Sequence, residues 1–253
     1  MAKTTEQTQS SLFEIFNGSY KFFHNGQPYA EESFKLFQYP HNRSLTFFSQ
    51  IRSLYKIKGD IFSMKITYKV DENYSPLLLD MEKKHGTLFS KEIFTPGQSM
   101  DKLTYKFKSK NSKKEIEIQT PNEYHLACPA TCSTLIFSKK EKFNSVISKN
   151  FNIITSGNIW EYKRSPEIRT LSLKCLNPTE KENLTISKKS LNGTRFEVFS
   201  KNRGKWGDKI SYFISSDHAI PYQIIVDKNI KIEIDTFKKV LNSKLDQRRR
   251  KIC

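Results

Sequence analysis

Alternation of apolar and polar positions is the dominant pattern of this 253-residue chain. In the stretch 62–70, Phe, Met, Ile, Tyr and Val occupy every second position, and Ser, Lys and Thr occupy the others. Successive side chains of a strand point to opposite faces, so this period of two predicts a strand with one buried face and one wet face. The alternation recurs at 103–107, 116–118, 171–175, 196–198 and 230–234. The fold class is therefore predicted to be mainly β.

Short turn signals separate these runs. Asn25-Gly26, Gly59-Asp60 and Asn192-Gly193 are dipeptides that accept the positive φ of two-residue hairpin turns. Consecutive strands are therefore expected to be antiparallel, with residues 18–119 forming a meander of about eight strands. A long twisted meander with one apolar face has to curve around a common interior. The pattern predicts an open or closed β-barrel in a single domain over residues 18–235.

Three segments depart from the alternation and predict helices. Ser11-Leu-Phe-Glu14 has the spacing of a capping box, which favours a short helix within an N-terminal extension, 1–17. Between residues 121 and 165 the alternation fails, and Pro129 can open a helix over Ala130–Lys140. Behind Thr236, apolar residues return at helical spacing, which predicts an amphipathic, basic C-terminal helix over 236–253.

The composition narrows the class of protein. The chain has 43 Lys and Arg against 26 Asp and Glu, a net charge of +17, and 13% aromatic residues. The aromatic content favours a folded domain, and the charge, which is spread along the chain, favours anionic partners. No apolar run approaches the length of a transmembrane helix, and the polar first ten residues show no signal peptide, so a cytoplasmic location is expected. The scattered cysteines, Cys128, Cys132, Cys175 and Cys253, are expected to be reduced thiols.

The order of these elements is similar to that of a known superfamily. The meander Gly18–Gln119, the insertion around Ala130–Lys140 and the segment Ser216-Asp217-His218-Ala219-Ile220-Pro221 before a closing hairpin together resemble the LolA-like open barrels. That superfamily includes the bacterial lipoprotein carriers and a cofactor-free enzyme of violacein biosynthesis. The resemblance is one of layout, without a diagnostic motif. It implies a curved antiparallel sheet around a helical plug and, by analogy, lipid or small-molecule binding.

Polar residues on apolar strand faces are the candidate catalytic groups. Glu32 shares its strand face with Phe34 and Leu36, and Glu92 shares its face with Phe94. A carboxylate turned into an apolar interior has a raised pKa and can act as a general acid. The full set of candidate proton-transfer residues is Glu32, Glu92, His125 and His218. The expected ligand-binding wall consists of Phe62, Met64, Tyr68, Tyr105 and Tyr124.

Two further groups carry weaker signals. His125, Cys128 and Cys132 form an H-x2-C-x3-C segment with three potential zinc ligands, but no second Cys or His pair follows at a suitable distance. We therefore predict no metal and no cofactor. Asp80 and Glu82 share one strand face, opposite Leu79 and Met81, and are expected to face water rather than to form a catalytic pair.

The chain carries none of the common nucleotide-binding, hydrolase or zinc-protease motifs. The favoured function is binding of a hydrophobic, amphiphilic or anionic small molecule in the barrel, either as a carrier or as a cofactor-independent enzyme of specialised biosynthesis. The alternative is nucleic-acid binding, for which the basic loop Lys201–Lys209 and the tail Arg248–Lys251 are candidates. The same tail could also contact an anionic membrane surface weakly.

Overall fold

The computed structural model describes residues 12–99, 101–141, 143, 148–186, 188–202, 205–216 and 218–240. All strands belong to one sheet of 16 strands, which confirms the mainly β prediction. The first half of the chain supplies β1 (Phe13–His24), β2 (Gln27–Gln38), β3 (Leu45–Ser53), β4 (Phe62–Val70), β5 (Pro76–His85), β6 (Leu88–Pro96), β7 (Lys102–Ser109) and β8 (Lys113–Gln119). The second half supplies β9 (His125–Leu126), β10 (Ser148–Thr155), β11 (Glu167–Cys175), β12 (Glu182–Ile186), β13 (Lys189–Asn202), β14 (Lys205–Ser215), β15 (Pro221–Ile225) and β16 (Ile230–Lys239).

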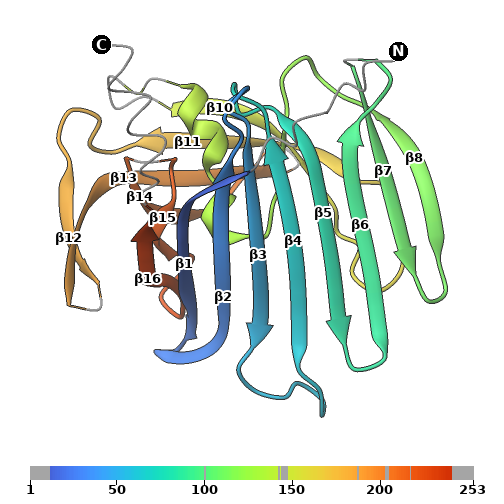
Figure 1. Cartoon of the computed structure of the whole chain (residues 1–253), viewed down its shortest axis with the longest axis horizontal. Coiled ribbons are helices and arrows are strands. Elements are labelled where there is room, and N and C mark those ends of the chain that lie inside the picture. Colours follow the sequence, from blue (N-terminus) through green and yellow to red (C-terminus); the bar gives the residue numbers. More distant parts are fainter. Residues whose placement is uncertain are drawn as a thin grey trace, which may run out of the picture.

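The sheet is open. Its strand order is β8-β7-β6-β5-β4-β3-β2-β1-β16-β15-β14-β13-β11-β10-β9, with β12 attached to β13, and the end strands β8 and β9 do not pair with each other. All pairings are antiparallel except β9 with β10. In Figure 1, β1–β8 stand upright at the front, while β10, β11 and β13 run across the view behind them. The meander of eight strands predicted from the sequence is present as β1–β8.

The period of two in the sequence sets which face is buried. In β3 the residues at 45, 47, 49, 51 and 53 are buried, and 48, 50 and 52 are exposed. The expected turn at Asn25-Gly26 joins β1 and β2, with φ of 49° and 77°. The turn expected at Gly59-Asp60 is shifted by one residue: Lys58 and Gly59 have φ of 50° and 91° and lie between the bridged residues Ile57 and Asp60, within the longer β3–β4 loop. Positive φ at both central residues suits the twist of a two-residue hairpin turn.

The insertion between β8 and β11 fills much of the space inside the curved sheet. Cys128, Ala130, Cys132 and Ile136 pack with the inner side chains of β1–β7. Leu135 and Phe137 pack instead with β10, β11, β13 and β14 (Figure 1). The insertion therefore supplies apolar side chains to both parts of the core and acts as a plug, as a half-buried curved sheet requires.

The helix predictions need correction. Of the residues expected as a short N-terminal helix, Ser11 lies outside the described residues, and those from Phe13 to Phe16 are the beginning of β1, which pairs with both β2 and β16. The helix expected over Ala130–Lys140 is two short 3-10 helices, η1 (Thr131–Ser133) and η2 (Ile136–Lys140), and the same insertion also contains β9 and β10. Thr236–Lys239, expected to begin the C-terminal helix, continues β16. In each case backbone pairing or packing outweighs a local helix signal.

Asn192-Gly193 is also not a turn. Both residues lie within β13, where Gly193 sits so close to β14 that a Cβ atom would approach the carbonyl oxygen of Ile214 to 2.4 Å. Glycine is needed here because the two backbones come close together, rather than for a turn.

Among the described residues, no helix has the length and apolar character needed to cross a membrane. The rest of the C-terminal segment, including Arg248–Lys251, lies outside the described residues.

Candidate functional site

A pocket of about 510 Å³ lies inside the curved sheet, between β4–β6 and the segments that follow β9 and end β10. One wall comes from the inner faces of β4, β5 and β6, and the other from residues 127–129 after β9 and from 155–159, the end of β10 and the residues that follow it. The lining is mostly apolar, with a polar group on one side. The apolar lining includes Phe62, Met64, Met81, Phe94 and Ile159, and the polar lining consists of Lys83, Glu92, Thr155, Ser156 and Asn158. Mostly apolar walls with a few convergent polar groups are typical of small-molecule sites.

A buried ion pair forms the polar side of this pocket. Lys83 Nζ lies 2.5 Å from Glu92 Oε1, and the two side chains are 11% and 1% exposed. Lys83 also donates to the carbonyl oxygen of Asn158 at 3.0 Å, and Tyr105 donates from its hydroxyl to Glu92 Oε2 at 2.8 Å. An ammonium group has three donors, so one N–H of Lys83 remains available to a ligand.

Asn158 ties the loop after β10 to this network. Its side-chain amide donates to the hydroxyl of Tyr105 at 2.9 Å and to the carbonyl oxygen of Arg164 at 2.8 Å. Its carbonyl oxygen accepts from the backbone N–H of Lys163 at 2.8 Å. Because Asn158 uses its donors and acceptor both within the loop and across to β7, it holds residues 158–164 over the inner face of the sheet.

Aromatic residues flank the entrance of the pocket. Trp160 stacks on His85, with ring centroids 6.3 Å apart, and meets Phe62 edge to face at the same distance. Ile159, which lines the pocket next to Trp160, is 55% exposed. We therefore take the exposed apolar side of the pocket, at Ile159 beside Phe62 and Trp160, as its mouth, whereas Lys83 and Glu92 are buried.

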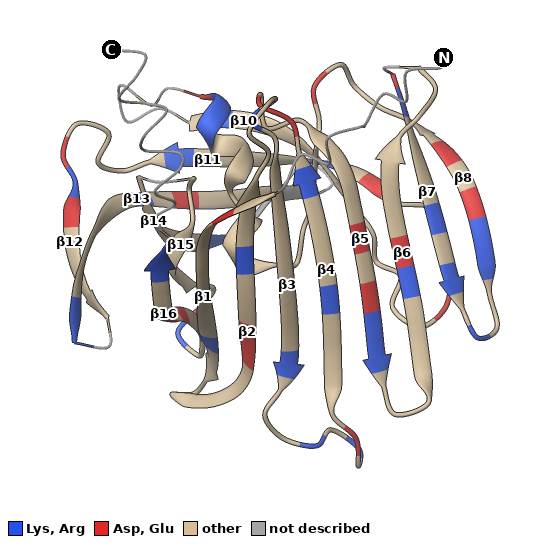
Figure 2. Ribbon diagram, viewed as in Figure 1, with Lys and Arg blue, Asp and Glu red and all other residues tan. Residues whose placement is uncertain are grey.

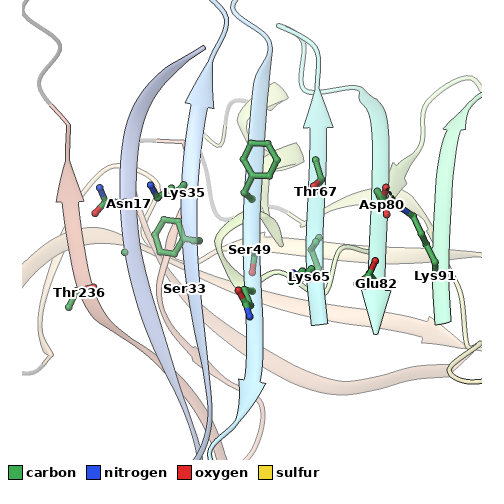
Figure 3. A pocket seen from close by; sticks show the side chains of 15 residues that line it. Asn17, Ser33, Lys35, Ser49, Lys65, Thr67, Asp80, Glu82, Lys91 and Thr236 are labelled. Carbon is green, nitrogen blue, oxygen red and sulfur yellow. Dashed lines mark ion pairs between the residues drawn. The ribbon is translucent and has the colours of Figure 1, made fainter. Parts of the chain in front are cut away.

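The outer face of the sheet has a second hollow of about 610 Å³ that crosses β16, β1 and β2–β6 (Figure 3). Lys35, Lys65 and Lys91 face it together with Asp80 and Glu82, as the sequence predicted for the two acids. Asp80 and Lys91 form an ion pair of 2.9 Å, but both are about one-third exposed, and such pairs contribute little. This hollow is shallow and solvated, with mixed charges, and we regard the inner pocket as the better candidate.

Glu32 lies elsewhere in the interior and anchors the plug. Its fully buried carboxylate accepts from the hydroxyl of Ser49 at 2.7 Å and from the backbone N–H of Thr131, at the start of η1, at 2.9 Å. Burial raises the pKa of Glu32, and these hydrogen bonds partly offset that rise. Glu32 does not line the inner pocket, and its contacts give it a role in positioning η1.

We expect Glu32→Gln to make the free energy of unfolding less dependent on pH. A raised carboxyl pKa in the folded state contributes stability below the ordinary pKa, and this contribution is lost as the pH rises through the raised value. The glutamine amide oxygen can accept from Thr131 N–H and its NH2 group can donate to the Ser49 hydroxyl, both without a charge. The free energy of unfolding of the variant should therefore rise relative to that of the wild type as the pH increases from about 4 to about 8. Urea unfolding across that range measures the difference.

Glu32→Ala is the matched control for this prediction. Alanine removes the acceptor for Thr131 N–H and, like glutamine, does not titrate, so we expect it to be less stable than Glu32→Gln by about 1–3 kcal/mol at every pH. Equal pH dependence in the wild type and Glu32→Gln would show that folding does not raise the pKa of Glu32.

The two candidate histidines lie away from the pocket. His125 is buried and stacks on Phe137 with ring centroids 4.9 Å apart, and its Nδ1 has no hydrogen-bond partner among the described residues. Burial, with a smaller contribution from Lys140, lowers the pKa of His125 to about 4. His218 has a φ of 51° and meets the ring of Phe16 edge to face at 5.6 Å. Neither histidine lines the inner pocket.

The H-x2-C-x3-C segment does not bring its three side chains to one point. His125 faces Phe137 and Phe151, whereas Cys132 lies beside Glu32. Burial raises the pKa of Cys128 to about 12 and that of Cys132 well above its usual range. Within the described part of the chain, no cluster of three or more His, Cys, Asp or Glu side chains could hold a metal ion. The segment is part of the plug's apolar core.

The structure brings together four of the residues singled out from the sequence. Phe62, Met64 and Glu92 line the inner pocket, and Tyr105 binds Glu92. Tyr68 is buried in the core, where burial raises its pKa, and Tyr124 packs against the same core at half burial. Of the loop Lys201–Lys209, residues 203 and 204 lie outside the described residues, and the flanking residues pair β13 with β14.

Sequence reasoning missed Lys83 and Asn158. Lys83 shares its strand face with Leu79 and Met81, so the period of two would have placed its side chain inside the sheet. Periodicity alone does not identify such a residue, because a lysine near a strand end is usually solvated. Asn158 lies in a segment without periodicity, and its role depends on contacts with β7 that no local pattern reveals.

Comparisons with known proteins do not identify a family. No model of a protein family matches the chain. No curated protein matches it either. Among solved structures, the chain is similar to the crystal structure of a DUF1089 family protein from Pseudomonas aeruginosa, with 9% sequence identity and a TM-score of 0.41 over 76% of this chain and 87% of that chain. This likeness is too weak to transfer a function, so the function has to be argued from the site.

Proposed function

We propose that the protein binds a hydrophobic or amphiphilic small molecule in the inner pocket, with the apolar part against β4–β6 and a polar head at Lys83. The observation that supports this most directly is the buried Lys83–Glu92 pair on one side of an otherwise apolar cavity of about 510 Å³. A cavity of this size is in the usual range for small-molecule sites.

The polar head that fits best carries an acceptor oxygen. Two donors of Lys83 bind Glu92 and the carbonyl oxygen of Asn158, and the third can bind a hydroxyl, carbonyl or carboxylate oxygen of the ligand. Thr155 and Ser156 line the same side and can add neutral hydrogen bonds. Hydrogen bonds to a charged group are worth more than neutral ones, so Lys83 should fix the orientation of the head.

This proposal agrees with the resemblance to LolA-like open barrels, in which a curved sheet surrounds a plug. Membership of that superfamily is part of the proposal. A role in specialised biosynthesis would require Glu92 to move a proton on the bound molecule, with Lys83 and Tyr105 holding the carboxylate in place. The same pocket serves both the binding and the enzymatic form of the proposal.

Nucleic-acid binding has weaker support. The outer hollow offers Lys35, Lys65 and Lys91, yet Asp80 and Glu82 lie among them. A nucleic-acid phosphate backbone binds best to a groove whose charges are all positive, and this face carries both signs. We therefore keep the small molecule as the proposed ligand.

Calorimetric titration with dodecanoate and with dodecanol tests the proposal, since the two probes share a tail and differ in the head. We expect both to bind, one molecule per chain. Ala127→Trp, which places an indole at an exposed position of the pocket wall, should weaken both by more than about tenfold through loss of apolar contact. Thr185→Trp on β12 is the matched control and should change neither affinity.

The head-group contact has a separate test. The double variant Lys83→Met with Glu92→Met fills the same space with unbranched apolar side chains. The ratio of the affinities for the two probes should be about tenfold smaller in this variant than in the wild type. Native mass spectrometry of the purified protein should also show a retained apolar compound. If Ala127→Trp and the wild type bind dodecanoate equally, the pocket is not the binding site.

A further inference from the structure

The loop between β3 and β4, residues 54–61, carries exposed apolar side chains beside the mouth of the inner pocket. Tyr55 is 62% exposed, Ile57 51% and Ile61 43%. Large aliphatic and aromatic side chains gathered in one exposed loop mark an interaction surface more often than single exposed apolar residues do.

Contacts connect this loop to the pocket. His85 donates from Nε2 to the carbonyl oxygen of Ile57 at 2.6 Å, and Trp160, next to pocket residue Ile159, stacks on the same imidazole. Phe62, which directly follows the loop, also lines the pocket. Whatever covers residues 54–61 therefore lies next to the pocket entrance.

The same end of the sheet is basic. In Figure 1 the β3–β4 loop extends beyond the ends of the β5–β6 and β7–β8 hairpins, and Figure 2 shows Lys and Arg at the lower ends of β3, β5 and the β7–β8 hairpin and in the loop itself, which also carries Asp60. Six exposed lysines of the β3–β4 loop and of the β7–β8 hairpin have no carboxylate partner among the described residues: Lys56, Lys58, Lys108, Lys110, Lys113 and Lys114. Lys108 and Lys113 even lie directly opposite each other in the β7–β8 pair, an arrangement that costs stability unless an anion is near.

We propose that this end of the sheet docks on an anionic lipid bilayer, with Tyr55 and Ile57 entering the interface and Lys56 and Lys58 contacting the headgroups. Apolar side chains that alternate with lysines fit the boundary between acyl chains and headgroups, where each gains its preferred surroundings. A nucleic acid would use the lysines but would leave Ile57 and Ile61 without a partner. Docking in this way turns the pocket mouth toward the bilayer, so that a membrane amphiphile could enter it, a consequence that rests on the proposed function.

Co-sedimentation of the full chain with vesicles tests the docking. We expect binding to phosphatidylcholine vesicles that contain phosphatidylserine, and little binding to phosphatidylcholine alone. Lys56→Glu with Lys58→Glu should weaken binding about 30-fold or more, since each cation near an anionic surface contributes appreciably. Lys181→Glu with Lys189→Glu, on the exposed β12–β13 hairpin, changes the net charge equally and should cause a much smaller loss.

The apolar contribution has its own pair of variants. Tyr55→Ser with Ile57→Ser should weaken binding to the anionic vesicles about tenfold. Leu77→Ser with Ile168→Ser, two exposed apolar positions on β5 and β11, is the control and should bind as the wild type does. A chain in which Arg248, Arg249 and Arg250 are replaced by Gln should retain most of the binding.

Four outcomes would overturn the docking proposal. They are no binding to anionic vesicles, equal losses in the loop and control variants, loss of all binding with the arginine variant, and a dimer that Tyr55→Ser with Ile57→Ser converts to a monomer. The last would show that a second copy of the chain covers the loop. The double variant Lys83→Met with Glu92→Met should bind vesicles normally, which separates failure of docking from failure of the pocket proposal.

Discussion

Glu92→Ala is expected to lower the free energy of unfolding by about 3–5 kcal/mol. The substitution leaves the ammonium group of Lys83, whose side chain is almost fully buried, without its counter-charge. It also removes the acceptor of the Tyr105 hydroxyl. Urea denaturation of the wild type and the variant at one pH measures the loss.

The double variant Lys83→Met with Glu92→Met provides the control. Replacing a buried ion pair by apolar side chains of similar shape is often neutral or stabilising, so this variant should lie within about 1–2 kcal/mol of the wild type. The double-mutant cycle, completed by Lys83→Met, then gives the coupling energy between the two side chains. A loss below about 1 kcal/mol for Glu92→Ala would mean that water in the pocket solvates Lys83.

His125 is expected to lower the free energy of unfolding in acid by on the order of 3 kcal/mol. Burial lowers the pKa of His125 in the folded state from 6.5 to about 4, so between these values the unfolded chain binds a proton that the folded chain does not. The free energy of unfolding should therefore be undiminished by His125 above about pH 6.5 and should fall as the pH decreases toward about 4. Chemical denaturation over this interval measures the effect.

His125→Phe should remove this acid-dependent loss, because phenylalanine keeps the stacking on Phe137 and has no proton to gain. Lys140→Gln should reduce the loss slightly, since the charge of Lys140 is the smaller cause of the lowered pKa. If the wild type and His125→Phe lose stability in parallel as the pH falls, another group governs the acid response.

Much of the front of the sheet was predictable because its determinants are local. A strand face is set by a period of two, and β4 shows it without interruption from Phe62 to Val70. The turn at Asn25-Gly26 was predictable for the same reason, as its φ values depend on two residues only. The prediction that the Glu92 side chain points into the interior of the sheet was correct, because Glu92 lies two positions from Phe94 on the same strand face.

The errors have a common cause, which is competition between local and long-range interactions. Thr236 and Phe237 carry a helix signal, yet β1 supplies backbone partners that extend β16 through them. The insertion follows the same logic, since its 3-10 helices form where the core needs Cys132, Leu135 and Ile136, rather than where helix propensity is high. Local propensity amounts to tenths of a kcal/mol per residue, whereas packing a large apolar side chain is worth about 1.5–3 kcal/mol.

The sequence by itself determined that the chain forms an antiparallel meander with one apolar face, since alternation and turn residues act over a few neighbouring positions. Only the tertiary structure decided that the sheet stays open, that the insertion fills its interior, and that Lys83, Glu92, Tyr105 and Asn158 meet at the remaining pocket. Those contacts join residues up to 75 positions apart. Their formation depends on the curvature of the whole sheet, which no short stretch of the chain encodes.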